Sequence, residues 1–325
     1  MKAVPFSPEQ MSATWDTAVR AARNATFLFE RGYMDYHQDR FEDASLLFQD
    51  EGGQTLGLLP ANIHHHEHRI CAHGGLTYGD LLLAPQATLT DARDMLKAAA
   101  IAYMQKDIHE LTIKPVPYIY HRYPADDSLY WLFRIGARLT ARTASTAIDL
   151  QNASLRRQLW HRKTKKGATA GLTLHEGGTS RLQAFWAIVE WVLATRHATH
   201  PVHTFDEMAL LMARFPDNVR LFTVDNPTGE VITGCIAFVT DTTVHIQYME
   251  AGEEARRRRA LDWLIERLIS HFAESGLRYF DFGISTEDGG RLLNEGLTYQ
   301  KEGFGGRTVC YDTYSVSLKQ LLNDL

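Results

Sequence analysis

Phe41-Glu42-Asp43-Ala44-Ser45-Leu46-Leu47-Phe48 has a counterpart about 174 residues later, in Phe215-Pro216-Asp217-Asn218-Val219-Arg220-Leu221-Phe222. In both places the chain continues through a glycine-containing turn into an apolar stretch, residues 57–63 in the first copy and 231–238 in the second. A further strand, an amphipathic helix and another strand are expected after each stretch. Two units of similar size and plan indicate a duplicated domain.

Length and composition agree with a duplication. The chain has 325 residues, 45% of them hydrophobic, which is enough for two domains with a core in each. A formal net charge of −5 argues against a nucleic-acid coat, so we expect no DNA partner. The three cysteines lack metal or redox spacing, and no run approaches the roughly 18 apolar residues of a membrane span. Together with the absence of an apolar signal core at the N-terminus, these features predict a cytoplasmic protein without a membrane span.

The hydrophobic pattern of the first copy alternates between helix and strand periods. We expect a helix at 8–22, strands at 25–30, 44–49, 55–63 and 68–73, a helix at 90–106 and a strand at 109–114. Residues 31–40, between two of these strands, are polar and aromatic and are predicted to form a loop.

The second copy is predicted in the same way. We expect a strand at 136–150, a basic helix at 154–166, helices at 180–196 and 204–214, strands at 219–225, 230–239 and 243–250, a helix at 257–274, and strands at 278–283 and 307–318. The basic helix carries Arg156, Arg157, His161, Arg162, Lys163, Lys165 and Lys166. It marks the expected domain junction.

Several stretches resemble a known family. They are residues 29–36 and 74–79 in the first copy, and residues 248–252, 279–283, 294–297 and 301–306 in the second. Together with the element order, they resemble the tandem-GNAT acyltransferases related to the Fem-type (FemAB-like) peptidyltransferases, a group often associated with the bacterial cell envelope. The resemblance covers nearly the whole chain. It implies an α+β (mixed α/β) fold of two tandem GNAT-like domains, residues 1–150 and 151–325, and acyltransferase activity.

The resemblance also implies an acyl-CoA donor such as acetyl-CoA, with one departure. Ordinary GNAT enzymes open the helix after the fourth strand with a glycine-rich turn that holds the pyrophosphate. Here residues 251–260 lack those glycines and carry four consecutive arginines instead. They either bind phosphate as charged forks or form a solvated basic turn facing Glu253 and Glu254. The predicted donor-binding residues are Tyr248, Met249, Arg256, Arg257, Arg258 and Arg259.

Acyl transfer needs a base, donors for the oxyanion and close alignment of the reactants. Glu250 follows the expected splay of the central strands, and Asp281 ends the next parallel strand beside a glycine, so both are candidate bases. Lys301 and Glu302 precede a glycine-rich stretch at 303–306 and are predicted as further catalytic residues, with Lys301 neutralising a phosphate or carboxylate on the acceptor. The competing interpretations are that Glu250 is a surface carboxylate, that Asp281 caps a loop, and that the stretch at 303–306 is a plain glycine-rich turn.

Three aromatic and charged loops of the first copy are predicted to bind the acceptor. Tyrosine rings suit sugars, whereas arginine and histidine suit phosphates. The predicted residues are Tyr33, Asp35, His37, Arg40, Tyr78, Tyr118, His121 and Arg122. Each tyrosine taken alone is better explained by packing than by binding.

Other chemistry is not favoured. The run of histidines at 64–68 and the group His197, His200 and His203 are predicted to be solvent-facing turns, so we expect no metal. No nucleophile elbow, P-loop or activated cysteine is visible.

Three functions follow as hypotheses. The first is an acyltransferase that acylates an amine or hydroxyl of a sugar or cell-envelope polysaccharide precursor. The second is an aminoacyl-tRNA-dependent peptidyltransferase of Fem type, for which tRNA would be a partner and the basic helix its contact. The third is a non-catalytic GNAT-fold binding module, because fold alone does not fix function.

Overall fold

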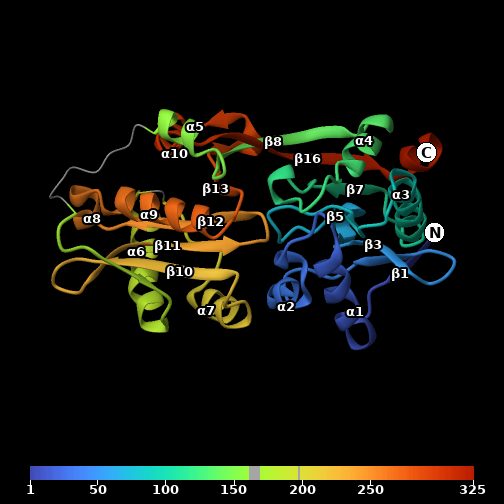
Figure 1. The fold of residues 1–325 in the computed structure, drawn as a ribbon. Helices are drawn as coiled ribbons and strands as arrows, with labels where there is room; N and C mark the ends of the chain where they lie inside the picture. The colour runs from blue at the N-terminus through green and yellow to red at the C-terminus, as the bar shows by residue number, and fades with distance from the viewer. Residues whose placement is uncertain (161–168, 197) are drawn as a thin grey trace. The chain divides into compact units, whose positions relative to one another are not determined.

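The computed structural model describes residues 1–160, 169–196 and 198–325 (Figure 1). The chain divides into two compact units. The first unit comprises Met1–Ala144, Thr286–Leu292 and Cys310–Leu325, and the second comprises Ser145–Ser285 and Leu293–Val309. Each unit combines helices and strands, which confirms the mixed α/β fold. The predicted domains at 1–150 and 151–325 stay a prediction about how the chain was duplicated.

The first unit contains two groups of strands. One sheet has the order β1 (Lys2–Pro5), β2 (Leu46–Gln49), β3 (Thr55–Leu59), β6 (Leu82–Leu83). The other strands follow the order β4 (Asn62–His64), β5 (Arg69–Ala72), β7 (Glu110–Ile113), β16 (Arg307–Ser317), β8 (Arg138–Asp149). The helices are α1 (Pro8–Ala21), α2 (Arg31–Met34), α3 (Leu89–Met104), α4 (Asp127–Arg134) and α11 (Leu318–Asp324). Short 3-10 turns are η1 (Phe27–Phe29), η2 (Asp35–His37), η3 (His65–Glu67) and η4 (Tyr118–Tyr120).

The second unit is built on one sheet with helices against it. Its strand order is β8, β13 (Tyr279–Ile284), β12 (Thr243–Ala251), β11 (Val231–Val239), β10 (Val219–Asp225), β9 (Thr173–Glu176). Its helices are α5 (Ala153–Leu159), α6 (Thr179–Arg196), α7 (Phe205–Arg214), α8 (Glu253–Arg258), α9 (Ala260–Glu274) and α10 (Glu295–Glu302). A small ladder of β14 (Thr286–Glu287) and β15 (Leu292–Leu293) flanks η5 (Asp288–Gly290), and residues 286–292 of it belong to the first unit.

The repeated strand, helix, strand plan is present in both units. In the first, α3 connects the parallel strands β5 and β7, and in the second α8 and α9 connect the parallel strands β12 and β13. The start of α3 and the packing of α9 both agree with their sequences. Thr88 caps α3 through a reciprocal capping box with Asp91. The predicted apolar stripe of α9 is buried at Leu264, Ile265, Leu268, Ile269 and Phe272.

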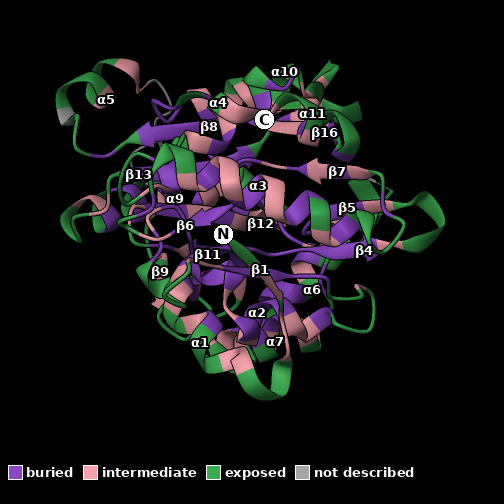
Figure 2. Ribbon diagram, turned by 90° about the vertical axis from the view of Figure 1, so that its right-hand side faces the viewer, coloured by how far each residue is buried: buried purple, intermediate pink, exposed green. Residues whose placement is uncertain are grey.

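Two helices cover the sheet of the second unit. The stripe of α9 packs in one cluster with Cys235, Ala237, Val244 and Ile246. Gly234 faces the other way, and a Cβ there would lie 2.8 Å from the ring of Phe185 on α6. Because neighbouring strand residues point to opposite faces, α6 and α9 cover opposite faces of the sheet (Figure 1). Strand β11 between them is buried along nearly its whole length (Figure 2).

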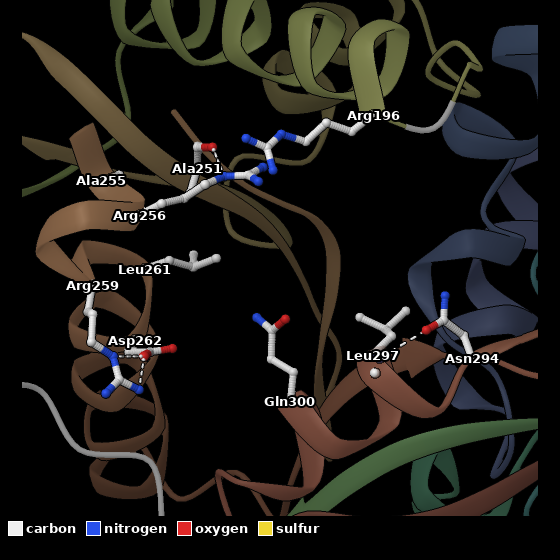
Figure 3. Close-up of a pocket in the computed structure, with 11 residues that line it drawn as sticks. Arg196, Ala251, Ala255, Arg256, Arg259, Leu261, Asp262, Asn294, Leu297 and Gln300 are labelled. Atoms are coloured by element: carbon white, nitrogen blue, oxygen red, sulfur yellow. Dashed lines mark hydrogen bonds and ion pairs between the residues drawn. The ribbon is translucent and has the colours of Figure 1, made fainter. Parts of the chain in front are cut away.

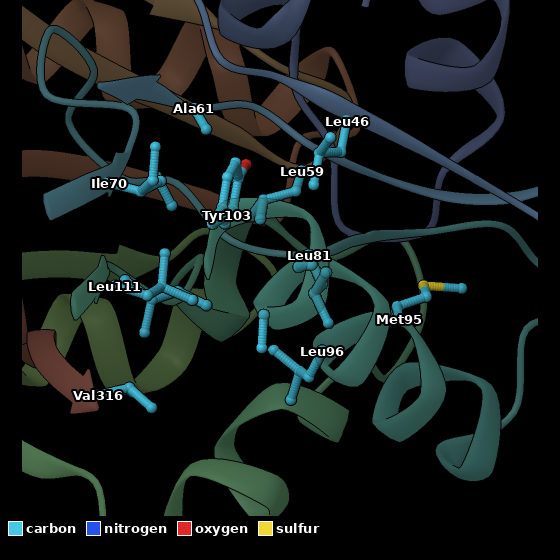
Figure 4. Close-up of a cluster of buried hydrophobic side chains, with 14 of the residues drawn as sticks. Leu46, Leu59, Ala61, Ile70, Leu81, Met95, Leu96, Tyr103, Leu111 and Val316 are labelled. Carbon is cyan, nitrogen blue, oxygen red and sulfur yellow. The ribbon is translucent and has the colours of Figure 1, made fainter. Parts of the chain in front are cut away.

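The first unit has its own core. Side chains from β2, β3, β5, β7 and α3 meet in one buried cluster, which includes Leu59, Ile70, Leu96 and Leu111 (Figure 4). Tyr103 lies fully inside it, and its hydroxyl donates to the carbonyl of Ala44 at 2.9 Å. A buried phenol needs such a partner, since an unsatisfied hydroxyl in an apolar core is unfavourable.

Four expectations from the sequence were wrong in detail. Residues 25–30 are not a strand but contain the 3-10 turn η1. A short apolar run that is buried on all sides shows no hydrophobic period, so its sequence does not distinguish a strand from a helical turn. Residues 31–40 form helical turns. The expected strand at 55–63 is split into β3 and β4, which join different sheets, because Pro60 between them has no N–H to donate. The helix expected from 257 is divided at Arg259, whose φ is 56°.

Part of the expected basic helix is seen as α5, which includes Arg156 and Arg157. His161, Arg162, Lys163, Lys165, Lys166 and His197 lie outside the described residues. No helix in the described part of the chain is both long and apolar enough to cross a bilayer.

Gly79 offers a test of the close packing after β5. A Cβ at this position would lie 1.6 Å from the carbonyl oxygen of Ala72, which is backbone and cannot swing aside. We expect Gly79→Ala to lower the free energy of unfolding by roughly 3 kcal/mol, the scale of overpacking, in urea denaturation. Gly296→Ala is the matched control, because its nearest neighbour atom would be 3.8 Å away. Equal stability of the two variants would contradict this packing.

Candidate active site

The two parallel strands of the second unit separate partway along their length. β12 and β13 pair only from Thr243 opposite Tyr279 to His245 opposite Asp281. Beyond that point β12 continues to Ala251 along β11, while Ile284 at the end of β13 pairs with Ser145 on β8. The C-terminal ends of parallel strands are where sites collect in such sheets. We call this opening the strand fork.

A histidine and an aspartate stand at the start of the strand fork. His245 Nδ1 lies 2.7 Å from Asp281 Oδ2. Asp281 is completely buried, and its other oxygen accepts from the Ser145 hydroxyl at 2.5 Å and the Gly283 N–H at 3.3 Å. With the Nδ1 proton directed at the carboxylate, the lone pair of neutral His245 lies on Nε2. This is the arrangement of a general base held by a carboxylate.

Gly283 keeps the outer edge of this imidazole open. Its φ is 75°, and a Cβ there would lie 3.2 Å from His245 Cε1 and 3.9 Å from Nε2. A larger residue would therefore crowd the ring and would also be strained at that φ. The His245 side chain keeps 14% of its surface exposed.

Lys301 lies near the same aspartate but does not present its ammonium to solvent. It is 4% exposed on α10, and Nζ donates to the carbonyls of Gly283 and Ile284, both at 2.8 Å. Burial lowers the pKa of Lys301 to about 8, opposed by the charge of Asp281. The lysine therefore fixes the loop that follows β13. Glu302, the last residue of α10, is partly exposed.

A cavity of about 850 Å³ lies at the far end of β12. It is lined by Arg196, Ala251, Ala255, Arg256, Arg259, Leu261, Asp262, Asn294, Gly296, Leu297 and Gln300. Figure 3 shows the guanidinium groups of Arg196 and Arg256 turned toward one another, with Arg259 paired to Asp262 farther along the wall. Like charges brought together in this way favour an anion between them. We call this cavity the arginine pocket.

The four consecutive arginines differ in their surroundings. Arg256 donates from Nε to the carbonyl of Ala251 at 2.9 Å, and Arg259 pairs with Asp262 at 2.7 Å, both in the wall of the pocket. Arg258 pairs with Glu254 at 2.7 Å, and Arg257 is exposed. Two of the four predicted phosphate contacts thus face the arginine pocket. Arg196, which the sequence prediction missed, joins them from the end of α6.

Glu250 lies beside these arginines. Burial raises the pKa of Glu250 to about 7, although the positive charges of Arg256 and Arg196 act in the opposite direction. A carboxyl with this pKa exchanges protons near neutral pH. It remains a candidate base, farther along β12 than His245.

Between His245 and the pocket, β12 carries a bulge. Its register with β11 shifts so that Tyr248 opposes Ile236 while Ile246 opposes Ala237, which leaves Gln247 as the extra residue. The Tyr248 hydroxyl lies 2.9 Å from His203 Nδ1, and burial raises the pKa of Tyr248. Met249 packs on the core of the second unit. These two predicted donor-binding residues therefore have side chains engaged with the protein.

The first unit has diverged at the equivalent place. With the 174-residue offset, Cys71 replaces His245, and its register partner Thr112 replaces Asp281. Beyond this pair the chain turns back on itself. Gly79 and Lys114 exchange two backbone hydrogen bonds of 2.8 and 2.9 Å, and Lys114 Nζ donates to the carbonyl of Leu76. Residues 73–79 thus occupy the position where the second unit has its strand fork.

The eight predicted acceptor residues all lie in the first unit. Tyr33, His37 and Tyr78 are buried among other rings. Asp35 pairs with Arg31, and His121 and Arg122 contact backbone carbonyls. Arg40 lies over the ring of Tyr36, whereas Tyr118 is 57% exposed. Most of the eight predicted acceptor residues are therefore engaged in contacts within the protein.

Comparisons with known proteins support the architecture. Residues 127–289, just over half of the chain, match the family model described as acetyltransferase (GNAT) domain, and the chain belongs to this family. It is therefore an acyltransferase of the GNAT superfamily. No curated protein gives a significant match.

Solved structures extend the likeness to nearly the full chain. FemX matches with a TM-score of 0.68 at 10% identity, covering 96% of this chain and 97% of that one. A tandem GNAT protein from the clavulanic acid biosynthesis pathway gives 0.56 at 14%, covering 98% of both. L-PGS from Bacillus licheniformis gives 0.57 at 14%, covering 98% and 96%. At these identities the likeness concerns the fold, and it confirms the predicted tandem-GNAT, Fem-like architecture.

The pKa of Glu250 makes stability depend on pH. Its pKa is about 7 in the folded chain and has an ordinary value of 4.5, so the folded state holds the proton more tightly. The stability that this tighter proton binding gives the folded state is fully present below pH 4.5 and is lost as pH rises through 7. We expect Glu250→Gln to gain up to about 3 kcal/mol relative to wild type between pH 5 and pH 8 in urea denaturation. Glu253→Gln, at an exposed site on α8, is the control. A constant difference across that range would contradict the assignment.

Proposed function

We propose that the second unit binds an acyl-CoA in the arginine pocket and transfers its acyl group to an amine or hydroxyl beside His245. The observation that carries this proposal is the position of the two sites on one strand. The arginine pocket begins at Ala251, six residues beyond His245, which is roughly 20 Å along an extended strand. A donor with an anionic end and a thioester end on a long narrow arm fits this separation.

The pocket suits a phosphate-bearing donor through its side chains. Arg196 and Arg256 face one another, and the charge of Asp262 is balanced by Arg259. Guanidinium groups bind phosphate oxygens through two parallel hydrogen bonds, which replaces the backbone cradle of the usual glycine-rich turn. The lining residues Leu261 and Leu297 add apolar surface for the rest of the donor.

The chemistry proposed at the strand fork is direct attack in a ternary complex. The acceptor nitrogen or oxygen attacks the thioester carbonyl as Nε2 of His245 takes its proton, so a C–N or C–O bond forms and the C–S bond breaks. The imidazolium then returns the proton to the departing thiolate. Buried Asp281 stabilises the imidazolium and holds the ring.

For the acceptor we retain an amine or hydroxyl of a sugar or cell-envelope polysaccharide precursor. The support is the family resemblance. The Fem-type alternative, an aminoacyl-tRNA donor, would place a nucleic-acid phosphate in the same arginine pocket. Donor binding distinguishes the two.

Calorimetric titration with acetyl-CoA tests the donor. We expect micromolar binding that weakens at least tenfold in the Arg196→Ala, Arg256→Ala double variant, because two charge-assisted phosphate contacts are removed. Arg257→Ala, from the same run but outside the pocket lining, should bind like wild type. If acetyl-CoA does not bind, the CoA donor is wrong and aminoacyl-tRNA becomes the donor to test.

Turnover tests the base. With acetyl-CoA and a panel of amino sugars and polyols, free thiol released by His245→Gln should fall by about 10²–10⁴-fold, the usual contribution of a general base. Asp281→Asn should also lower kcat, because the Nδ1 partner loses its charge. Glu250→Gln should stay within several-fold of wild type. The reverse result, loss with Glu250→Gln and retention with His245→Gln, would move the base to Glu250.

A further inference from the structure

A group of metal-ligating side chains lies in the first unit, on residues that the proposed acyl transfer does not use. His68, Asp107 and His109 each offer one ligand atom, and these three atoms all lie within 4.8 Å of one another. We propose that they bind a first-row divalent transition metal such as Zn²⁺ or Ni²⁺. This site is independent of the proposed acyl transfer.

The sheet itself brings the two imidazoles together. Arg69 pairs with Glu110 at the start of the parallel strands β5 and β7, and one residue earlier the N–H of His109 donates to the carbonyl of His68 at 2.8 Å. Register neighbours in a sheet direct their side chains to the same face. The two rings accordingly stack, with centroids 5.4 Å apart and planes 16° from parallel.

The carboxylate comes from the turn after α3. Asp107 Oδ2 lies 3.2 Å from His68 Nδ1, and Oδ1 lies 3.4 Å from His109 Nε2, so the carboxylate reaches both rings. His68 Nδ1 also lies 2.8 Å from the carbonyl of Asp107.

The donor set selects the class of metal. Two imidazoles and one carboxylate suit Zn²⁺, Ni²⁺, Cu²⁺ or Co²⁺ and do not suit Mg²⁺ or Ca²⁺, which prefer all-oxygen sites. Ligands around such an ion lie roughly 3.5 Å apart, so the side chains must approach by about an ångström. They can do so, because the side chains of His68, Asp107 and His109 are 49%, 75% and 65% exposed. Water would complete the coordination.

The neighbouring histidines of the run at 64–68 have other roles. His65 pairs with Glu42 at 3.1 Å, and His64 Nε2 lies 3.0 Å from the amide of Asn62. His66 is exposed and does not belong to the group of three. The run as a whole is therefore not the site, and His66 supplies a matched control.

The test is calorimetric titration of the untagged full chain with NiCl₂, in a Cys310→Ser background that removes the exposed thiol. We expect one equivalent to bind with roughly micromolar affinity at pH 7.5. Binding should weaken at least tenfold at pH 5.5, because imidazoles must lose their protons to bind metal. Added Mg²⁺ should not compete.

Two variants locate the site. Neither variant should disturb the turn. Asparagine tolerates the φ of 59° at position 107, and position 109 lies outside the turn with positive φ. The variants are Asp107→Asn and His109→Ala. Each should raise Kd at least tenfold, while His66→Ala stays within twofold of wild type. Unchanged binding in Asp107→Asn and His109→Ala, or no binding by wild type below millimolar Ni²⁺, would overturn the proposal.

Discussion

The candidate site depends on one completely buried carboxylate. Asp281 has no contact with water, and an ionised carboxylate in that position is strongly unfavourable unless every oxygen has a partner. Ser145 from β8, His245 from β12 and the N–H of Gly283 supply those partners, and Lys301 from α10 secures the loop that follows. Three strands and a helix therefore have to be in place together. The same contacts that satisfy the carboxylate orient the imidazole for proton transfer.

The two units share a plan, but only the second carries this arrangement in the described residues. Both units keep a parallel strand pair connected by helix, but the first has Cys71 and Thr112 at the paired positions. Its chain then folds back so that Gly79 meets Ala72 and Lys114, which requires glycine. In the second unit the strands part, and the pocket forms where β12 ends. Neutral thiol and hydroxyl groups tolerate such closure better than a buried carboxylate would.

Several site residues were predictable from sequence, though their roles were not. Asp281 lies in an apolar strand two residues before Gly283, so its position near an opening was expected. Lys301 was predicted to meet an acceptor, but it lies inside α10 with its ammonium held by two carbonyls. His245 gave no local signal, because a single histidine in a strand is usually a packed residue. Only comparison with Cys71 at the 174-residue offset marks it as different. Arg196 ends a helix 60 residues away from Arg256, and no sequence pattern relates them.

The sequence by itself indicated a repeated plan, the order of most helices and strands, and a GNAT-type fold, because these depend on periodic apolar residues and local turn chemistry. The tertiary structure decided which side chains share a site. His245 and Asp281 meet only because two strands distant in the chain pair in a particular register, and Arg196 and Arg256 meet only because α6 and α8 pack on one sheet. Register and packing are set by the whole core, and local sequence does not encode them.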